Sequence, residues 1–507
     1  MLDLWFVYAI PFVFSVIFLT KWFFTAPTQR NSPPSPPTFP VVGNLHQVGL
    51  YPHRSLQKLA HQYGPLMLLH FGSRPVLVVS SSDAAREIMK THDLIFLSRP
   101  KFSVGHRLLY NGRDMTMSPY GEYWKQLRSV CALQLLSNKR VQSFRAVREE
   151  EVALLVDNIK RSSNSSSSPV NLSDMFALLT NDVICRIAFG KKYSGDEKGK
   201  RFKELISELM ELLGGFHVGD YIPWLGWVHY VNGLDAQVDK VAIEFDRFLD
   251  GVVEEHANTS NDKEKRCDQD GGEDKKDFVD VLLEIQSDQM AGYSLDRESI
   301  KAIILNMFVG GTDTTYTVLE WAMAELLRHP RVMNKLEDEV METGKGKPSI
   351  TENDLDKMHY LKAVIKETLR LYPPVPLLLP RESTQNVSIK GYDIAAETMV
   401  ITNAWAIGRD PKLWDKPEEF QPERFLDSGI DVKGQSFGFI PFGSGRRGCP
   451  GTLFAMVIDE LSLANVVHKF DWSLPDGVRA QDLDMTECIG ATIHRKAPLL
   501  AVATPRC

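Results

Sequence analysis

The sequence predicts a mostly helical protein with a small β-rich part and a single amino-terminal transmembrane helix. Three observations predict this fold class: a proline-free stretch over about 296–329 with apolar residues at helical spacing, two short β-type runs around a turn at 72–75, and an almost wholly apolar stretch at 4–19. The composition is 43% hydrophobic and 24% charged, so the chain can bury a sizeable core. A disordered or fibrous protein is therefore excluded.

Residues 1–24 are predicted to be a membrane anchor. Leu4 to Leu19 reads LWFVYAIPFVFSVIFL, and with the aromatic residues at 22–24 it approaches the roughly 20 residues that span a bilayer. A cleaved signal peptide is the alternative, but it needs a basic start, whereas Asp3 precedes this run and Lys21 follows it. Positively charged residues that flank a membrane span tend to remain on the cytosolic side. We therefore expect a single pass through the membrane, with membrane lipid as a partner and the rest of the chain in the cytosol.

Residues 25–50 are predicted to be a proline-rich spacer, and 51–507 the catalytic domain. Asn31 to Pro40 reads NSPPSPPTFP, and because proline fixes φ this stretch should be stiff and extended. An ordinary linker and a device that holds the domain at a set height over the lipid remain equally open. Beyond the spacer, Leu66–Phe71 and Val76–Ser80 predict a β-hairpin.

The stretch from about Asp296 to His329 predicts one long helix near the middle of the domain. It lacks proline, and its apolar residues Ile300, Ile303, Ile304, Met307 and Phe308 recur at helical spacing. Its length would be about 50 Å at the usual rise per residue. Polar residues within it argue against its being a second membrane span.

The charge and the cysteines exclude other classes of protein. The net charge of -7 is spread along the chain without a long basic block, so no nucleic acid is expected as a partner. The six cysteines lie far apart with no CxxC pair, which argues against a disulfide scaffold and a structural zinc site. We expect a reducing compartment.

A cysteine in a glycine-rich turn is the strongest candidate for chemistry. Pro441 to Gly451 reads PFGSGRRGCPG and precedes a helix predicted over 452–470. A cysteine just before a helix meets free N–H groups and the positive end of the helix dipole, which favour thiolate. Phe442 could pack against a flat ligand, and Arg447 suits an anionic group. A buried structural cysteine is the alternative interpretation of Cys449.

Phe442, Gly445, Arg447, Cys449 and Gly451 match every position of the signature FxxGxRxCxG, and the chain resembles the cytochrome P450 superfamily. The resemblance implies a cytochrome P450 fold and haem b bound through the Cys449 thiolate, which favours O–O cleavage. The chain looks closest to plant microsomal members that act on specialised metabolites. This similarity implies the endoplasmic reticulum membrane, with the catalytic domain in the cytosol.

A second motif lies on the long predicted helix. GGTDTT at 310–315 resembles the family's [AG]GxDT, with Gly310 where alanine is common. Each glycine costs about 1 kcal/mol relative to alanine in a helix, so the pair indicates room for a ligand or a local distortion. Thr314 can donate to the carbonyl of Gly310 four residues earlier. The resemblance implies that Asp313 and Thr314 deliver protons for oxygen activation.

Three further motifs imply residues around the haem. Glu367 and Arg370 match ExxR, and Arg424 in PERF is expected to complete a structural cluster with them rather than to contact substrate. Trp124 and Arg128 match WxxxR, which implies contact with a haem propionate; a packed tryptophan and a solvated arginine are the alternative. A further propionate partner is expected at Arg381.

The resemblance implies an oxidoreductase that inserts one atom of O₂ into an apolar small molecule by hydroxylation or epoxidation. No nucleotide-binding motif is visible, so electrons should come from an NADPH-dependent flavin reductase that docks near Lys125, Arg128, Lys139, Arg140 and Arg446. Terpenoid, phenylpropanoid or coumarin, and alkaloid substrates remain open. The segments expected to contact substrate are Phe102–Tyr120, Leu209–Val218, Leu305–Asp313, Val375–Leu379 and Cys488–Thr492.

Two rival functions remain. A haem-thiolate isomerase or dehydratase would need neither O₂ nor a reductase, but it would have little use for Asp313 and Thr314. A haem sensor or a membrane-tethered binding protein would not be an enzyme at all.

Overall fold

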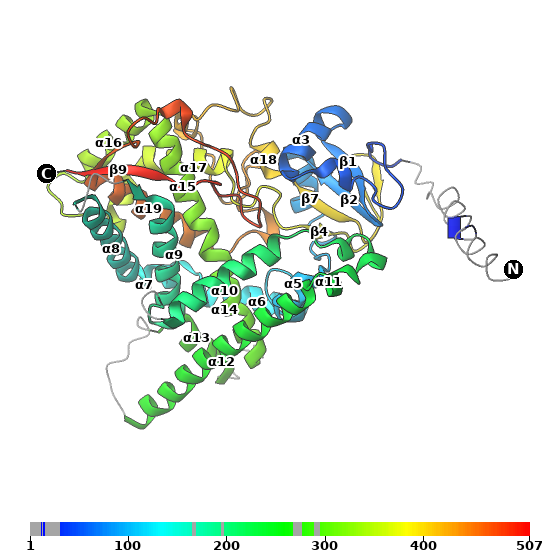
Figure 1. Ribbon diagram of the computed structural model, residues 1–507, viewed down its shortest axis with the longest axis horizontal. Helices are drawn as coiled ribbons and strands as arrows, with labels where there is room; N and C mark the ends of the chain where they lie inside the picture. The colour runs from blue at the N-terminus through cyan, green and yellow to red at the C-terminus, as the bar shows by residue number, and fades with distance from the viewer. Residues whose placement is uncertain are drawn as a thin grey trace.

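The computed structural model describes residues 12, 14–15, 31–164, 169–193, 197–266, 276–287 and 295–506. Most of the apolar run that carries the anchor prediction lies outside these residues. Among the described residues, no helix combines the length and apolar character that crossing a bilayer requires. The helices form one large part of the molecule, and the first strands gather with α3 at one end of it (Figure 1).

The described chain is mostly helical, as predicted. The α-helices are α2 (Leu45–Val48), α3 (Pro52–Tyr63), α4 (Ser82–Arg86), α5 (Ser103–Leu108), α6 (Glu122–Ser129), α7 (Asn138–Ser143), α8 (Arg145–Asn164), α9 (Leu172–Phe189), α10 (Glu197–Gly214), α11 (Val228–Val231), α12 (Leu234–Arg266), α13 (Phe278–Ser287), α14 (Arg297–Gly311), α15 (Asp313–Arg328), α16 (Pro330–Thr343), α17 (His359–Leu371), α18 (Ala404–Ile407) and α19 (Thr452–Lys469). Short 3₁₀ or π turns are η1 (Glu87–Thr91), η2 (Tyr110–Gly112), η3 (Val130–Leu135), η4 (Val218–Asp220), η5 (Pro223–Leu225), η8 (Glu352–Lys357), η9 (Pro422–Phe425), η10 (Gly445–Arg447) and η11 (Ala480–Asp482).

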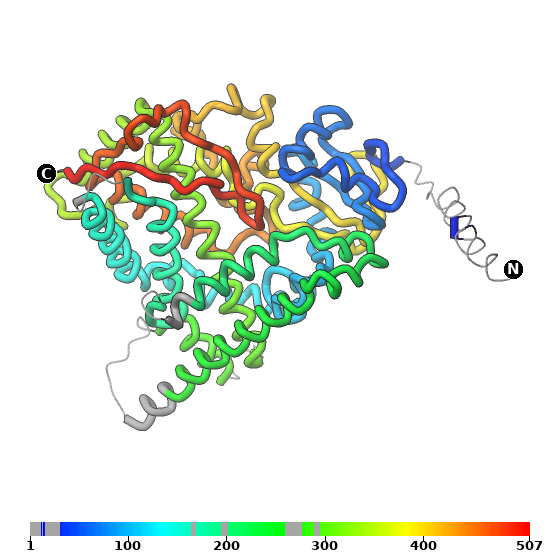
Figure 2. The backbone as a smooth tube through the Cα atoms, viewed as in Figure 1, coloured from blue at the N-terminus to red at the C-terminus, as the bar shows by residue number. Residues whose placement is uncertain are grey.

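The small β-rich part is also present. The strands are β1 (Leu66–Phe71), β2 (Arg74–Val79), β3 (Val170–Asn171), β4 (Arg381–Glu382), β5 (Val387–Ile389), β6 (Tyr392–Ile394), β7 (Met399–Thr402), β8 (Phe470–Ser473) and β9 (Leu500–Pro505). The predicted hairpin is the antiparallel pair β1–β2, in a sheet of order β1-β2-β7-β4 where β7 runs parallel to β2. Figure 2 shows the blue and yellow segments, far apart in sequence, side by side in this sheet.

The predicted long helix is two helices, α14 and α15, which meet at Thr312. Its outer limits agree with the prediction, because the Asp296 side chain accepts from Ser299 N at the start and His329 ends the second helix. The prediction of one unbroken helix was wrong at Thr312. Nearly all of α15 from Thr317 to Leu327 is buried on every side, which makes this helix pair the centre of the largest hydrophobic core.

The described part of the proline-rich stretch packs against the β1–β2 sheet. Leu68 N donates to the Pro34 carbonyl at 3.0 Å, and the buried Asn44 amide donates to the Pro36 carbonyl at 3.3 Å. Proline has no N–H to donate, so its carbonyls provide the contacts. From Asn31 onward, this stretch is therefore attached to the folded domain.

Candidate functional site

A backbone hydrogen bond and several glycines fix the shape of the loop that carries Cys449. Cys449 N donates to the Phe442 carbonyl at 2.9 Å, which closes the turn, and α19 begins at Thr452 as predicted. Gly445 has a φ of +71°, and a Cβ there would lie 2.4 Å from the Met89 carbonyl oxygen. At Gly451 a Cβ would meet the Cys449 sulfur at 3.8 Å. Gly445 therefore lets the loop pass close to Met89, and Gly451 puts no side chain next to the sulfur.

Cys449 lies deep in the molecule, yet its side chain is accessible, so it faces internal space. Burial raises the pKa of the Cys449 thiol, against the Gly451 N–H, the Arg128 charge and the Thr452 hydroxyl, which lower it. The Gly451 N–H and the Thr452 hydroxyl therefore favour thiolate, as expected for a cysteine at the start of a helix, and burial opposes them. A metal ion bound by the sulfur would add a positive charge that favours thiolate further.

A cluster of buried arginines lies beside this loop. Arg99 and Arg447 donate to main-chain carbonyls, at 2.6–2.9 Å for Arg99 and 2.6–3.2 Å for Arg447, and within the described residues neither has a carboxylate partner. Burial and the charge of Arg381 lower the pKa of Arg447 to about 9. The pKa of Arg99 is lowered by burial and by Arg447 and Arg381. Such a cluster favours an anionic ligand, and the two propionates of haem would fit it.

The predicted propionate partners have different surroundings. Trp124 is buried, donates its Nε1–H to the Met115 carbonyl at 3.0 Å, and carries the Arg447 guanidinium over its ring at 4.2 Å. Arg128, one turn further along α6, lies near Cys449, and burial lowers its pKa. Arg381 donates to Asp93 at 3.1 Å and to the Ser444 carbonyl at 2.7 Å, so its charge is partly satisfied within the protein.

The second motif lies at the junction of α14 and α15. The Thr314 hydroxyl donates to the Gly310 carbonyl at 2.7 Å, which is the contact that the sequence indicated. Gly310 is exposed although the rest of this helix pair is largely buried, and a Cβ there would meet nothing within 4 Å. Open space therefore adjoins Gly310 and Thr314, while a Cβ at Gly311 would press on Ile184 at 2.7 Å.

Asp313 has a hydrogen-bond partner that the sequence did not indicate. Its carboxylate accepts a hydrogen bond from the Thr492 hydroxyl, 179 residues later. Burial raises the pKa of Asp313, and the charge of His494 and the Tyr316 hydroxyl lower it. No local pattern marks Thr492, because the contact depends on how the carboxyl-terminal loop packs on α15. Arg99 was missed for the same reason.

Glu367, Arg370 and Arg424 meet in the interior. Arg370 forms a two-pronged bond to Glu367, with both distances 2.7 Å, and Arg424 Nε donates to Glu367 Oε1 at 3.0 Å. Glu367 and Arg370 are fully buried. The cluster joins α17 to η9, the turn that holds PERF.

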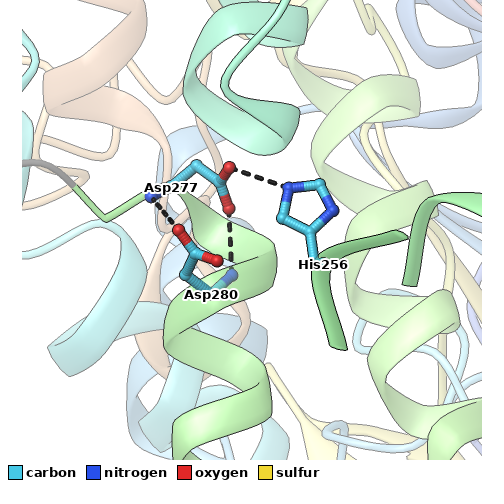
Figure 3. Close-up of side chains that lie close together, drawn as sticks. All are labelled: His256, Asp277 and Asp280. Carbon is cyan, nitrogen blue, oxygen red and sulfur yellow. Dashed lines mark hydrogen bonds and ion pairs between the residues drawn. The ribbon is translucent and has the colours of Figure 1, made fainter. Parts of the chain in front are cut away.

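One group of potential metal ligands lies outside this region, between α12 and α13 (Figure 3). His256 Nε2 bonds Asp277 Oδ2 at 2.9 Å, and Nδ1 donates to the Val252 carbonyl at 2.8 Å. Asp277 and Asp280 cap each other's backbone N–H at the start of α13. Burial lowers the pKa of His256, but the bonds to Asp277 and Val252 outweigh it and raise the value to about 9. Both ring nitrogens are therefore engaged within the protein, and His256 and Asp277 form an ion pair.

In a mostly helical fold, an accessible cysteine sulfur beside buried arginines that lack carboxylate partners among the described residues suits a haem-thiolate protein. The family model described as Cytochrome P450 matches residues 33–501, and the chain belongs to this family. Members are monooxygenases that contain haem b, so the predicted family, enzyme class and cofactor are confirmed.

Similar proteins are plant proteins that match over nearly their whole length. The chain is 59% identical to Cytochrome P450 736A117 of Prunus mume, over 97% of this chain and 94% of that protein. It is 53% identical to Norfluorocurarine oxidase of Strychnos sp, covering 97% and 96%, and 49% identical to Tabersonine/lochnericine 19-hydroxylase of Catharanthus roseus, covering 99% and 98%.

The solved structures agree on the fold. A zebra fish cytochrome P450 determined with progesterone has a TM-score of 0.76 and 25% identity, covering 90% of this chain and 99% of that chain. A structure with abiraterone has a TM-score of 0.74 and 26% identity, covering 90% and 100%.

Proposed function

We propose that this protein hydroxylates or epoxidises an apolar specialised metabolite, with O₂ and electrons from an NADPH-dependent flavin reductase. One observation carries the proposal: Cys449 presents an accessible sulfur to internal space beside buried arginines that lack carboxylate partners. Haem b, when bound through this sulfur, supplies oxygen activation. Arg447, Arg99, Trp124 and Arg128 would hold its propionates.

The chain's own residues would supply protons. Asp313 carries an ionisable group at the α14–α15 junction, and the Thr314 hydroxyl lies one residue away beside open space. Insertion of one oxygen atom while the other becomes water consumes two electrons and two protons. We assign Asp313 and Thr314 to the delivery of those protons, because a carboxyl group and a hydroxyl can pass them on from water.

The substrate is proposed to be neutral and apolar. Asp114 and Asp313 lie in two of the segments expected to contact it, and both carboxylates already accept hydrogen bonds. Neither position therefore offers a free carboxylate to a cationic amine, so an alkaloid would bind as its neutral free base. Leu377 and Leu378 add apolar surface from a third such segment. The oxidase of Strychnos and the hydroxylase of Catharanthus have alkaloid substrates in their names, which favours an alkaloid over the terpenoid and phenylpropanoid classes.

The reductase is proposed to dock over the cysteine loop. A hollow of about 860 Å³ there is lined by Cys449, by the basic residues Arg128, Arg145, Lys362, Lys366 and Lys433, and by the acidic residues Glu352, Asp356, Asp431 and Glu460. Of the basic residues expected from sequence, Arg128 lines this hollow, Lys125 pairs with Glu122, and Arg446 pairs with Asp93. Lys139 and Arg140 lie on the neighbouring α7.

Localisation in the endoplasmic reticulum membrane, through a single pass, is part of the proposal. The apolar run at 4–19 supports it. A group of exposed apolar residues, called here the aromatic patch, also supports it: Phe216, Trp224, Trp227, Tyr230 and Val231. The patch is tied to the β1–β2 turn, since Ser73 N donates to the Tyr221 carbonyl at 2.9 Å. Trp and Tyr are typical of membrane interfaces.

The test combines a spectrum with turnover. We expect the reduced carbonyl complex of the wild-type protein to show the red-shifted Soret band of thiolate ligation, and Cys449→Ser to lose both the band and activity. Cys488→Ser, which changes another cysteine, should retain the band. With reductase and NADPH, an alkaloid panel should yield oxygenated products whose added oxygen derives from ¹⁸O₂. Turnover without O₂ would instead indicate an isomerase or dehydratase.

A further inference from the structure

The carboxyl-terminal loop at 487–495 is fixed firmly to α15. Trp321 Nε1 donates to the Ile493 carbonyl at 2.9 Å, and Arg495 N donates to Glu320 Oε2 at 2.9 Å. Trp321 is fully buried, and Glu320 and Arg495 are nearly so. These two bonds lie on either side of His494 in the loop, so this part of the chain has a defined position against the helix that carries Asp313.

Thr492 uses this position to contact Asp313. It is buried, and its hydroxyl donates to Asp313 Oδ2. The resemblance placed Thr492 at the end of a segment that contacts substrate, but the hydroxyl is engaged by the carboxylate. A donor fixed by its own backbone restricts the directions that a carboxylate can take.

His494 adds a positive charge beside the same carboxylate. Burial lowers its pKa, but hydrogen bonds with Cys488 and the Arg495 carbonyl and the charges of Cys488 and Asp313 raise it to about 9. The ring is half-buried and lies 5.8 Å from the Tyr316 ring, centroid to centroid. The positive charge of His494 therefore acts on Asp313 and opposes the effect of burial on its pKa.

The other titratable groups around Asp313 come from the same two elements. Among the described residues, α15 contributes Tyr316 and Glu320, and the loop contributes Cys488 and Arg495 besides His494. Burial raises the pKa of Glu320, which the Ser173 hydroxyl and Arg495 oppose. His494 is thus the cation whose charge acts directly on Asp313.

We infer that Thr492 and His494 are positioning residues for Asp313: the Thr492 hydroxyl sets the direction of the carboxylate, and the nearby His494 side chain favours its ionised form, which can take protons from water. This inference rests on the proposed role of Asp313 in proton delivery. The carboxyl-terminal loop then governs how efficiently electrons from NADPH end in product.

The first test uses the full-length holoenzyme with reductase and measures product formed per NADPH consumed. We expect Thr492→Val to lower this ratio roughly tenfold with KM unchanged, as for loss of one hydrogen bond to a charged group. Thr492→Ser should restore it, and Thr504→Val, at an exposed position of β9, should leave it unchanged. A raised KM with an unchanged ratio would place Thr492 against substrate and overturn the inference.

The second test measures the pKa of His494 by NMR of ¹³C-labelled histidine in the diamagnetic ferrous carbonyl enzyme, with His494→Gln to assign the signal. Loss of the Asp313 charge in Asp313→Asn should lower that pKa, while Thr492→Val should leave it raised. Identical titration in wild type and Asp313→Asn would contradict the inference. In His494→Gln, the pKa of Asp313 should rise. As the pH is lowered, the ratio of product to NADPH should therefore begin to fall at a higher pH than in wild type.

Failure of the inference is distinct from failure of the proposed function. If Asp313→Asn leaves the ratio of product to NADPH unchanged, Asp313 has no role in proton delivery, and both ideas fall. If Asp313→Asn lowers the ratio while Thr492→Val and His494→Gln do not, Asp313 acts without the loop, and only the present inference is wrong.

Discussion

Gly310 shows how one residue can define the space next to a reactive group. It lies one helical turn before Thr314, accepts the Thr314 hydroxyl with its carbonyl, and has no neighbour that a Cβ would touch within 4 Å. Gly311, the next residue, is already close to Ile184. The two glycines therefore have different reasons to be small: Gly310 leaves room for a ligand, and Gly311 leaves room for a neighbouring helix.

Gly310→Ala should stabilise the protein while changing its product pattern. Alanine in place of glycine in a helix gains about 0.5–1 kcal/mol in the free energy of unfolding. Its methyl group would enter the open space, so we expect a shift in the position oxidised or a higher KM for bulky substrates. Denaturant unfolding and product analysis measure both effects. Gly311→Ala is the matched control, and we expect it to lose stability. An unchanged product pattern in Gly310→Ala would show that the substrate does not use the space beside Gly310.

At the scale of elements, ion pairs join neighbouring helices and turns of the fold. The Glu367 cluster ties α17 to η9, and the His256–Asp277 pair ties α12 to α13. Removing one partner of a buried pair leaves an uncompensated charge, which costs more than the pair contributes. The half-buried His256 pair is the weaker of the two and titrates in an accessible range.

His256→Gln should reduce stability in a pH-dependent way. The folded pKa of His256 is raised to about 9, so its stabilising contribution is fully present below the ordinary histidine value and is lost as pH rises through 9. After allowance for solvent screening we expect roughly 1–2 kcal/mol at pH 6 and almost none above pH 9. Urea unfolding of both proteins at these pH values measures this, with exposed His61→Gln as control. A constant difference across pH would refute the ion pair.

At the scale of the whole molecule, the aromatic patch and the β1–β2 sheet lie on the same side (Figure 1). The continuously described part of the chain begins at Asn31, close to this sheet, where Leu68 N donates to the Pro34 carbonyl. Tyr230 is 81% exposed and Trp227 61% exposed, which would be costly on a surface that met only water. The patch and an anchor joined through residues 31–40 could therefore rest on one lipid surface.

Lipid contact can be measured in full-length protein reconstituted into bilayers that contain brominated acyl chains. We expect these lipids to quench part of the tryptophan fluorescence, and the double change Trp224→Phe with Trp227→Phe to remove part of the quenched signal. The control is Trp472→Phe, on β8 and half-buried against the core. An unchanged quenched signal in the double variant would show that the patch does not enter the lipid.

Much of the fold and the centre of the site could be predicted from short stretches of sequence. Helix limits near Asp296, His329 and Thr452 agree with the sequence, because capping side chains, proline and apolar spacing act within a few residues. The five positions around Cys449 identified the family for a similar reason: a turn that exposes a sulfur needs its own glycines in fixed places.

Only the tertiary structure decided what surrounds those residues. Packing brought Arg99 beside Arg447 and placed Thr492 on Asp313. Burial also raises the pKa of the Cys449 thiol, against the donors at the start of α19. These features arise between segments hundreds of residues apart and depend on burial, which removes water from a charge. Local sequence determines which groups are present and in what helix or turn, whereas the electrostatic energy of each group is determined by the whole fold.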